Sequence, residues 1–144
     1  MYVAGIDPGQ TIGVALIQGA TPHRAKVLES FEISHEEIDI YRLFWRWYRE
    51  MTELDPAETL NCVVEDFVGA GPRSKPSNDT LKVIGGVIFT CRALKIPCTA
   101  VQPQVRLSYV AQVSTMTTGR DAISALAHAY SHLGRICSRG NAKR

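Results

Sequence analysis

The sequence predicts an α/β fold in which a mixed five-stranded sheet is flanked by helices. Three successive strand-like segments open the chain, and two further strands then alternate with helices, in the order β-β-β-α-β-α-β-α. A meander pairs antiparallel, whereas strands joined through helices pair parallel, so the sheet is expected to be mixed. No internal repeat or linker divides the 144 residues, and this length suits one domain.

The strands are predicted from runs of β-branched and apolar residues. They are expected at residues 2–7, 11–17, 26–33, 61–65 and 97–101. Between the first two lies Pro8-Gly9-Gln10, where proline fixes one φ angle and glycine permits a positive one. This pattern predicts a hairpin.

Helical periodicity is expected at residues 35–54, 79–94 and 121–133. The first helix has Ser34 as its expected N-cap and an apolar arc wider than one sheet face needs. That arc indicates either deep packing or a self-association surface. In the second helix Gly85 and Gly86 each cost about 1 kcal/mol, so a close neighbour is expected against them. The domain is expected to span residues 1–137, followed by a basic, flexible tail at 138–144.

The composition is that of an ordinary globular protein, with 45% hydrophobic and 21% charged residues. A net charge of +2 gives no bulk electrostatic case for a nucleic-acid partner, so any such case depends on where the charges lie. No apolar run approaches the ~20 residues that a membrane helix needs. The first ten residues lack a basic segment and contain Asp7, which argues against a secretory signal.

The cysteines show no metal-binding spacing. They stand at positions 62, 91, 98 and 137, with no CxxC motif and no ligand-like pairing with the four histidines. We expect buried free thiols in a reducing compartment, and therefore a cytoplasmic location.

Three carboxylates occupy positions where strands end or a helix starts. Asp7 ends the first strand, Glu65 ends the fourth, and Asp121 opens the last helix. If the first and fourth strands are neighbours and the last helix packs on them, the three converge at one edge of the sheet. Mg²⁺ prefers such hard oxygen ligands, and a pair of ions can activate water against a phosphodiester.

Each acid also has an ordinary structural explanation. Asp7 precedes Pro-Gly and suits a turn, and Glu65 could be a solvated strand-end acid, with Asp66 as a competitor for its role. Asp121 suits the positive end of a helix, although a helix-terminal acid can also bind a metal.

Three segments resemble the motifs of the RuvC family of Holliday-junction resolvases. They are residues 5–16 (GIDPGQTIGVAL), 63–67 (VVEDF) and 121–127 (DAISALA), and they occur in the family's order. The resemblance implies a ribonuclease H-like fold, compatible with the element order along about residues 1–136. The compact loops look most like those of a bacteriophage-type member.

This resemblance implies a homodimeric, metal-dependent endonuclease that resolves four-way DNA junctions by paired phosphodiester hydrolysis. By the same resemblance, Asp7, Glu65 and Asp121 are the catalytic metal ligands for two Mg²⁺ ions, with Mn²⁺ as a substitute. Two alternatives remain open: a less selective nuclease for forks and flaps, and a catalytically impaired DNA-binding module.

The site departs from the family pattern at one position. A fourth acid or a histidine usually stands one helical turn before the last aspartate, where this chain has Thr118. His128 lies two turns beyond Asp121, about 10 Å along the helix axis, too far to share its metal ion. We expect His128 and His132 to be helix-surface residues rather than contacts to a DNA phosphate.

The DNA contacts also depart from the family, because residues 107–119 contain no lysine or arginine. Phosphate contacts are expected instead from residues that follow Glu65 or adjoin Asp121, unless these are merely solvated surface residues. The candidates are Arg73, Lys75, Asn78, Lys82 and Arg120. Phe67 is expected either to stack on bases at the junction or to lie in the core.

Overall fold

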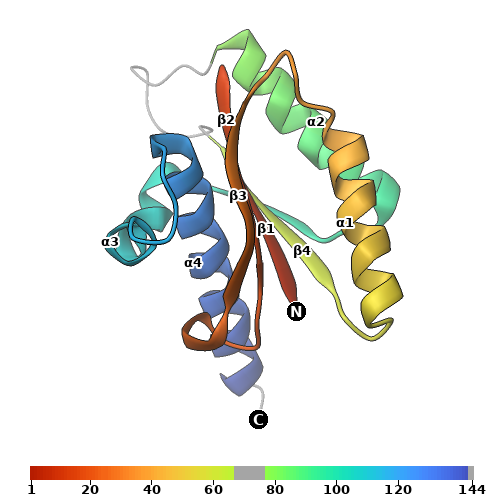
Figure 1. The fold of residues 1–144 in the computed structure, drawn as a ribbon, viewed down its shortest axis with the longest axis vertical. Coiled ribbons are helices and arrows are strands. Elements are labelled where there is room, and N and C mark those ends of the chain that lie inside the picture. Colours follow the sequence, from red (N-terminus) through yellow and green to blue (C-terminus); the bar gives the residue numbers. More distant parts are fainter. Residues whose placement is uncertain (67–76, 143–144) are drawn as a thin grey trace.

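The computed structural model describes residues 1–66 and 77–142. Five strands form one sheet in the order β3-β2-β1-β4-β5 (Figure 1). The strands are β1 (Tyr2–Asp7), β2 (Thr11–Gln18), β3 (Lys26–Ser34), β4 (Leu60–Glu65) and β5 (Cys98–Val101). β1, β2 and β3 pair antiparallel, whereas β4 pairs parallel to both β1 and β5. The predicted mixed sheet is therefore confirmed, with β1 at its centre.

Helices cover both faces of this sheet. α1 (Ile40–Leu54) and α2 (Asn78–Leu94) lie on one face, and α4 (Arg120–Ala142) lies on the other (Figure 1). The short elements are η1 (Pro22–Arg24), η2 (Pro103–Ser108) and α3 (Val110–Val113). In the described ranges, no helix combines the length and apolarity that crossing a bilayer requires.

Each face of the sheet has its own hydrophobic core, and the strand alternation decides which residues enter which core. Ile6 and Val64 are buried in the core beneath α1 and α2. The residues that follow them, Asp7 and Glu65, therefore face the opposite side, where α4 packs.

α1 begins at Ile40, five residues later than predicted. Its N-cap is Asp39, whose side chain accepts a hydrogen bond from the Arg42 N–H at 3.0 Å. Ser34, the expected cap, is the last residue of β3, and its carbonyl accepts turn hydrogen bonds from Glu37 and Ile38. An aspartate closer to the apolar stripe therefore caps the helix in its place.

α4 continues to Ala142, well beyond the predicted end at residue 133. Most of the expected tail at 138–144 is thus the last part of a helix, while residues 143 and 144 lie outside the described residues. Gly134, which follows the last predicted helical residue, does not end the helix. A side chain there would crowd the Tyr109 hydroxyl, 3.1 Å from the added Cβ, so the glycine allows packing and the helix continues.

The two neighbouring glycines of α2 differ. A Cβ on Gly86 would lie 3.1 Å from Ile40 Cδ1, which confirms the expected close approach to α1. At Gly85 no described residue lies within 4 Å of the corresponding position, so the expected close neighbour is not found there.

Candidate functional site

Asp7 and Glu65 lie side by side on the face of the sheet that α4 covers. The parallel register pairs Ile6 with Val64, and the two acids are the next residues of β1 and β4. Both are buried, with exposed fractions of 9% for Asp7 and 3% for Glu65. Of the two acids at the end of β4, Glu65 and not Asp66 faces α4.

Two glycines let α4 lie directly on the sheet and bring Asp121 to this site. A Cβ on Gly13 would overlap the backbone carbonyl of Asp121, and one on Gly5 would overlap the carbonyl of Ala125. Gly13 is the antiparallel partner of Asp7, so the first turn of α4 rests beside Asp7. The structure thus brings the three predicted acids to one end of the same sheet face.

The donor set has the chemistry that divalent cations prefer. All three side chains are carboxylates, the hard oxygen ligands of Mg²⁺ and Mn²⁺. Among the described residues, these acids do not form a set whose ligand atoms all lie within 4.8 Å of one another.

His128 is a functional candidate that was placed wrongly from the sequence. Its side chain is 0% exposed, and its Nε2 lies 2.7 Å from Oε2 of Glu65. The hydroxyl of Ser124 also donates to Glu65 Oε2, at 3.3 Å. The expectation of a surface residue was wrong because α4 crosses the sheet toward β4, so the start of its third turn, which carries His128, covers the end of that strand.

The hydrogen-bond partners of His128 indicate its tautomer. Nδ1 is buried and has no hydrogen-bond partner among the residues that the structure describes, whereas Nε2 faces the Glu65 carboxylate. When Glu65 is ionised its carboxylate only accepts, so Nε2 is then the donor. One signal in the sequence pointed here: Asp121, Ser124 and His128 stand at i, i+3 and i+7 and therefore share a helix face.

Glu32 is a fourth acid at the site, and sequence reasoning missed it. Its Oε1 accepts from the backbone N–H of Asp121 at 2.8 Å and of Ala122 at 3.3 Å. Glu32 pairs with Gly13 across β2 and β3, so it belongs to the same row of the sheet as Asp7. An exposed acid on an edge strand carries no distinguishing pattern, and only the packing of α4 shows that it caps this helix.

Thr118, the expected fourth position, is exposed and lies outside α4. Gly119, between Thr118 and the start of the helix, has a φ of +96°. This left-handed conformation breaks the helical path. Thr118 is therefore not on the helix that carries Asp121.

The candidate DNA contacts divide into two groups. Phe67, Arg73 and Lys75 lie outside the described residues. Asn78 and Lys82 are exposed on the first turns of α2, and Arg120 is exposed at the first residue of α4. Figure 1 shows that α2 and α4 both begin at the end of the sheet where β1 and β4 finish.

Comparison with solved structures identifies the architecture. The chain aligns with Thermus thermophilus RuvC at 19% sequence identity, covering 98% of this chain and 97% of that one, with a TM-score of 0.61. It aligns with T. thermophilus RuvC in complex with a Holliday junction substrate at 18% identity, covering 94% of each chain, with a TM-score of 0.60. The chain has the RuvC fold.

Other comparisons add little. The yeast mitochondrial Holliday junction resolvase Ydc2 aligns at 11% identity over 96% of this chain and 85% of that one, with a TM-score of 0.49. No family model matches the sequence, and no curated protein sequence matches it. The resemblance to RuvC is thus confirmed for the fold, a ribonuclease H-like mixed sheet, along nearly the whole chain.

Proposed function

We propose that this protein is a structure-selective endonuclease that resolves four-way DNA junctions by paired phosphodiester hydrolysis. The observation that carries the proposal is the convergence of Asp7, Glu65 and Asp121 on one face of the sheet, within the fold of RuvC. Fold alone does not determine activity, so the argument depends on this ordered carboxylate site. A T. thermophilus RuvC chain of the same fold was solved with a Holliday junction.

Asp7, Glu65 and Asp121 would hold two Mg²⁺ ions, for which Mn²⁺ would substitute. When bound, the ions supply an activated water and neutralise charge at the scissile phosphate. Burial of Asp7 and Glu65 limits water around the ligands, which strengthens their attraction for a cation.

Other residues of the chain prepare these ligands. His128 and Ser124 both contact the same oxygen of Glu65, Oε2, and so fix the orientation of this carboxylate. Glu32 bonds the first N–H groups of α4 and so fixes the helix start that carries Asp121. We assign His128 and Glu32 as positioning residues.

DNA would approach from the end of the sheet where the acids lie. Lys82 and Arg120 provide positive charge there, and Asn78 adds a neutral hydrogen-bonding side chain. We retain Phe67, Arg73 and Lys75 as proposed contacts on the basis of the sequence. A role on branched DNA implies a location with that DNA, in the cytoplasm of a bacterial or phage-infected cell.

Paired cuts require two sites, and a two-fold homodimer supplies them. Large apolar side chains are exposed on both α1 and α2, namely Tyr41, Trp45, Leu81 and Phe89. They lie on the face of the sheet opposite the carboxylates. We propose that these helices include the dimer surface.

A second candidate is a DNA-binding module with impaired catalysis. The exposed position of Thr118 outside α4 favours it, because the fourth ligand of the family pattern is then missing. Cleavage of labelled four-way junctions, forks, flaps and duplexes with Mg²⁺, Mn²⁺ or EDTA separates the candidates. The proposal predicts symmetric, metal-dependent nicks in the four-way junction. Equal cutting of forks and flaps would indicate a less selective nuclease, and tight binding without cutting would indicate the impaired module.

A further inference from the structure

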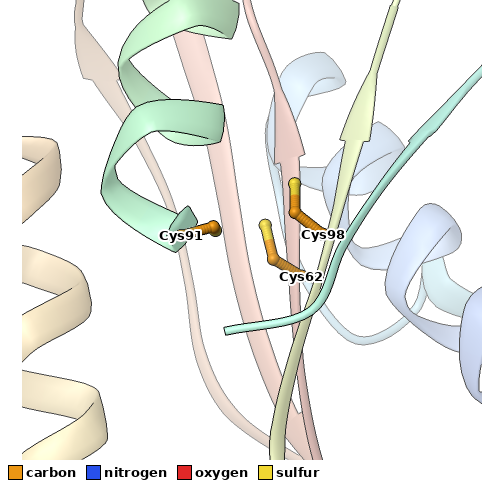
Figure 2. A group of neighbouring side chains, drawn as sticks. All are labelled: Cys62, Cys91 and Cys98. Carbon is orange, nitrogen blue, oxygen red and sulfur yellow. The ribbon is translucent and has the colours of Figure 1, made fainter. Parts of the chain in front are cut away.

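Three of the four cysteines meet in the core between the sheet and α2. Cys62 comes from β4, Cys91 from α2 and Cys98 from β5, and their sulfur atoms all lie within 4.8 Å of one another (Figure 2). All four cysteines are free thiols, as predicted, and Cys62 and Cys91 are buried; the sequence spacing gave no sign that three of them would meet. The three residues are far apart in the sequence, and only strand pairing and helix packing bring them together.

The pairing of β4 with β5 and the packing of α2 on these strands hold the three cysteines in place. Cys62 and Cys98 are direct partners in the parallel register of β4 and β5. Cys91 is fully buried on the inner face of α2, and Cys62 is fully buried beneath it. Cys98 is partly exposed, so the cluster lies within reach of solvent.

The thiols influence one another's ionisation. Hydrogen bonds from Cys62 and Cys91 lower the pKa of Cys98 to about 4, and electrostatic interactions with His132 and Arg92 act in the same direction. Hydrogen bonds to Cys91 and Cys98, together with burial, raise the pKa of Cys62 well above its usual range. The thiolate is the form that binds metals, and three mutually close sulfur atoms supply the donor set.

We propose that Cys62, Cys91 and Cys98 form a binding site for one thiophilic d¹⁰ cation, Zn²⁺ or Cu⁺. Zinc–thiolate bonds of about 2.3 Å place tetrahedral sulfur ligands ~3.8 Å apart, so the cluster needs only a small contraction. Three thiolates suffice for Cu⁺, whereas Zn²⁺ takes a fourth ligand from the partly exposed side. Binding forms three metal–sulfur bonds and releases the remaining thiol protons to solvent, and no electrons are transferred.

The site is separate from the proposed nuclease centre. Cys62 and Glu65 both lie on β4 but face opposite sides of the sheet, Cys62 toward α2 and Glu65 toward α4. Soft thiolates select against Mg²⁺, and hard carboxylates prefer it. The cation would join β4, β5 and α2, so its effect is on stability, and it does not depend on the nuclease proposal.

Metal titration of the reduced, metal-free protein tests the proposal. Cd²⁺ serves as the spectroscopic probe through its sulfur-to-metal absorption, and Zn²⁺ and Cu⁺ are titrated in parallel with native mass spectrometry. We expect one ion per chain for Cd²⁺ and for at least one of the other two, with release of protons to solvent. At ~100 times the dissociation constant, Tm should rise by about 5–10 °C.

Single variants locate the site. Cys98→Ala changes the most accessible member, and we expect it to lose the Cd²⁺ absorption and the Tm increase while keeping the far-ultraviolet circular dichroism of the folded protein. Cys91→Ala should do the same. Cys137→Ala is the matched control, because Cys137 lies outside the cluster and its thiol donates to the Ala20 carbonyl. The proposal is overturned by absence of binding to the reduced protein, by unchanged binding in Cys98→Ala, or by loss of binding in Cys137→Ala.

Discussion

Glu65 receives hydrogen bonds from two residues of α4, Ser124 and His128, and the stronger geometry is that of His128. Truncating the imidazole would remove the 2.7 Å contact that His128 makes with this buried carboxylate. We predict that His128→Ala lowers the single-turnover rate of junction cleavage about 10–100-fold, the range typical of residues that orient metal ligands.

The control is His132→Ala, which removes a histidine one turn further along the same helix, away from the Glu65 hydrogen bonds. It should retain the cleavage rate. A His128→Ala protein that cuts at the unchanged rate would contradict the positioning role. Junction binding, measured in EDTA, should be equal in all three proteins.

Glu32 joins the β3 edge to the first turn of α4 through two hydrogen bonds. Glu32→Ala removes a side chain that acts as an N-cap, and we predict a loss of about 1 kcal/mol in the free energy of unfolding. Glu32→Gln keeps an acceptor oxygen and should lose less. Urea denaturation of the three proteins measures the difference, and equal stabilities would show that the cap contributes nothing.

The sequence predicted the three central acids because each stands where a strand ends or a helix begins. It did not identify His128 or Glu32. Their roles depend on the angle at which α4 crosses the sheet, and that angle is set by Gly5 and Gly13 through contacts between distant parts of the chain. The fourth position was predicted at Thr118 by resemblance, but the backbone at Gly119 places this residue outside the helix.

At the scale of elements, the contact between α4 and β2 depends on a missing side chain. We predict that Gly13→Ala pushes α4 away from the sheet, costs about 1–3 kcal/mol in unfolding free energy and lowers cleavage, because Asp121 moves with the helix.

Gly85→Ala is the matched control, since the same added methyl group meets nothing within 4 Å. It should be neutral or stabilise α2 by about 0.5–1 kcal/mol. Thermal unfolding and cleavage rates are measured on both proteins. Equal stabilities and cleavage rates in the two variants would show that the close approach of α4 to β2 contributes to neither stability nor activity.

The five strands and three long helices were predicted in order and type because their patterns are local. The boundaries of two helices were not. The start of α1 depends on which of several nearby polar residues caps it, and the local hydrogen bond of Asp39 decides this. Gly134 leaves room for the Tyr109 hydroxyl, a contact between distant parts of the chain, and α4 continues through it.

For the whole molecule, the exposed apolar side chains of α1 and α2 lead to a prediction about assembly. Phe89 is 72% exposed, which is unusual for a large aromatic residue outside an interface. We predict a dimer in solution that Phe89→Glu or Trp45→Glu weakens at least about tenfold.

Sedimentation equilibrium provides the association constant, and Glu36→Gln is a control for changed charge at an exposed position on the connection between β3 and α1. A starting protein that is monomeric at all concentrations would contradict the prediction. A dimer unaffected by both substitutions would place the interface elsewhere.

The mixed sheet and its two helical layers followed from the element order, but the sequence could not show that β4 and β5 bring Cys62 and Cys98 together. Strand register and helix packing create that cluster, just as they create the hydrogen bond between Glu65 and His128. The chemistry of single residues was thus easier to predict from the sequence than which of them come into contact in the folded chain.

The most direct test of the central claim is the single-turnover cleavage of a four-way junction by the protein and by Asp7→Asn, in Mg²⁺ and with both cut strands labelled. Asp7 is the acid on the central strand, and its replacement by the isosteric amide removes one charge without changing volume. We predict paired symmetric nicks in the junction by the starting protein. In Asp7→Asn, the rate should fall by at least about 10³-fold, while junction binding in EDTA is retained. Cleavage at an undiminished rate by Asp7→Asn, or no cleavage by the starting protein in Mg²⁺ or Mn²⁺, would contradict it.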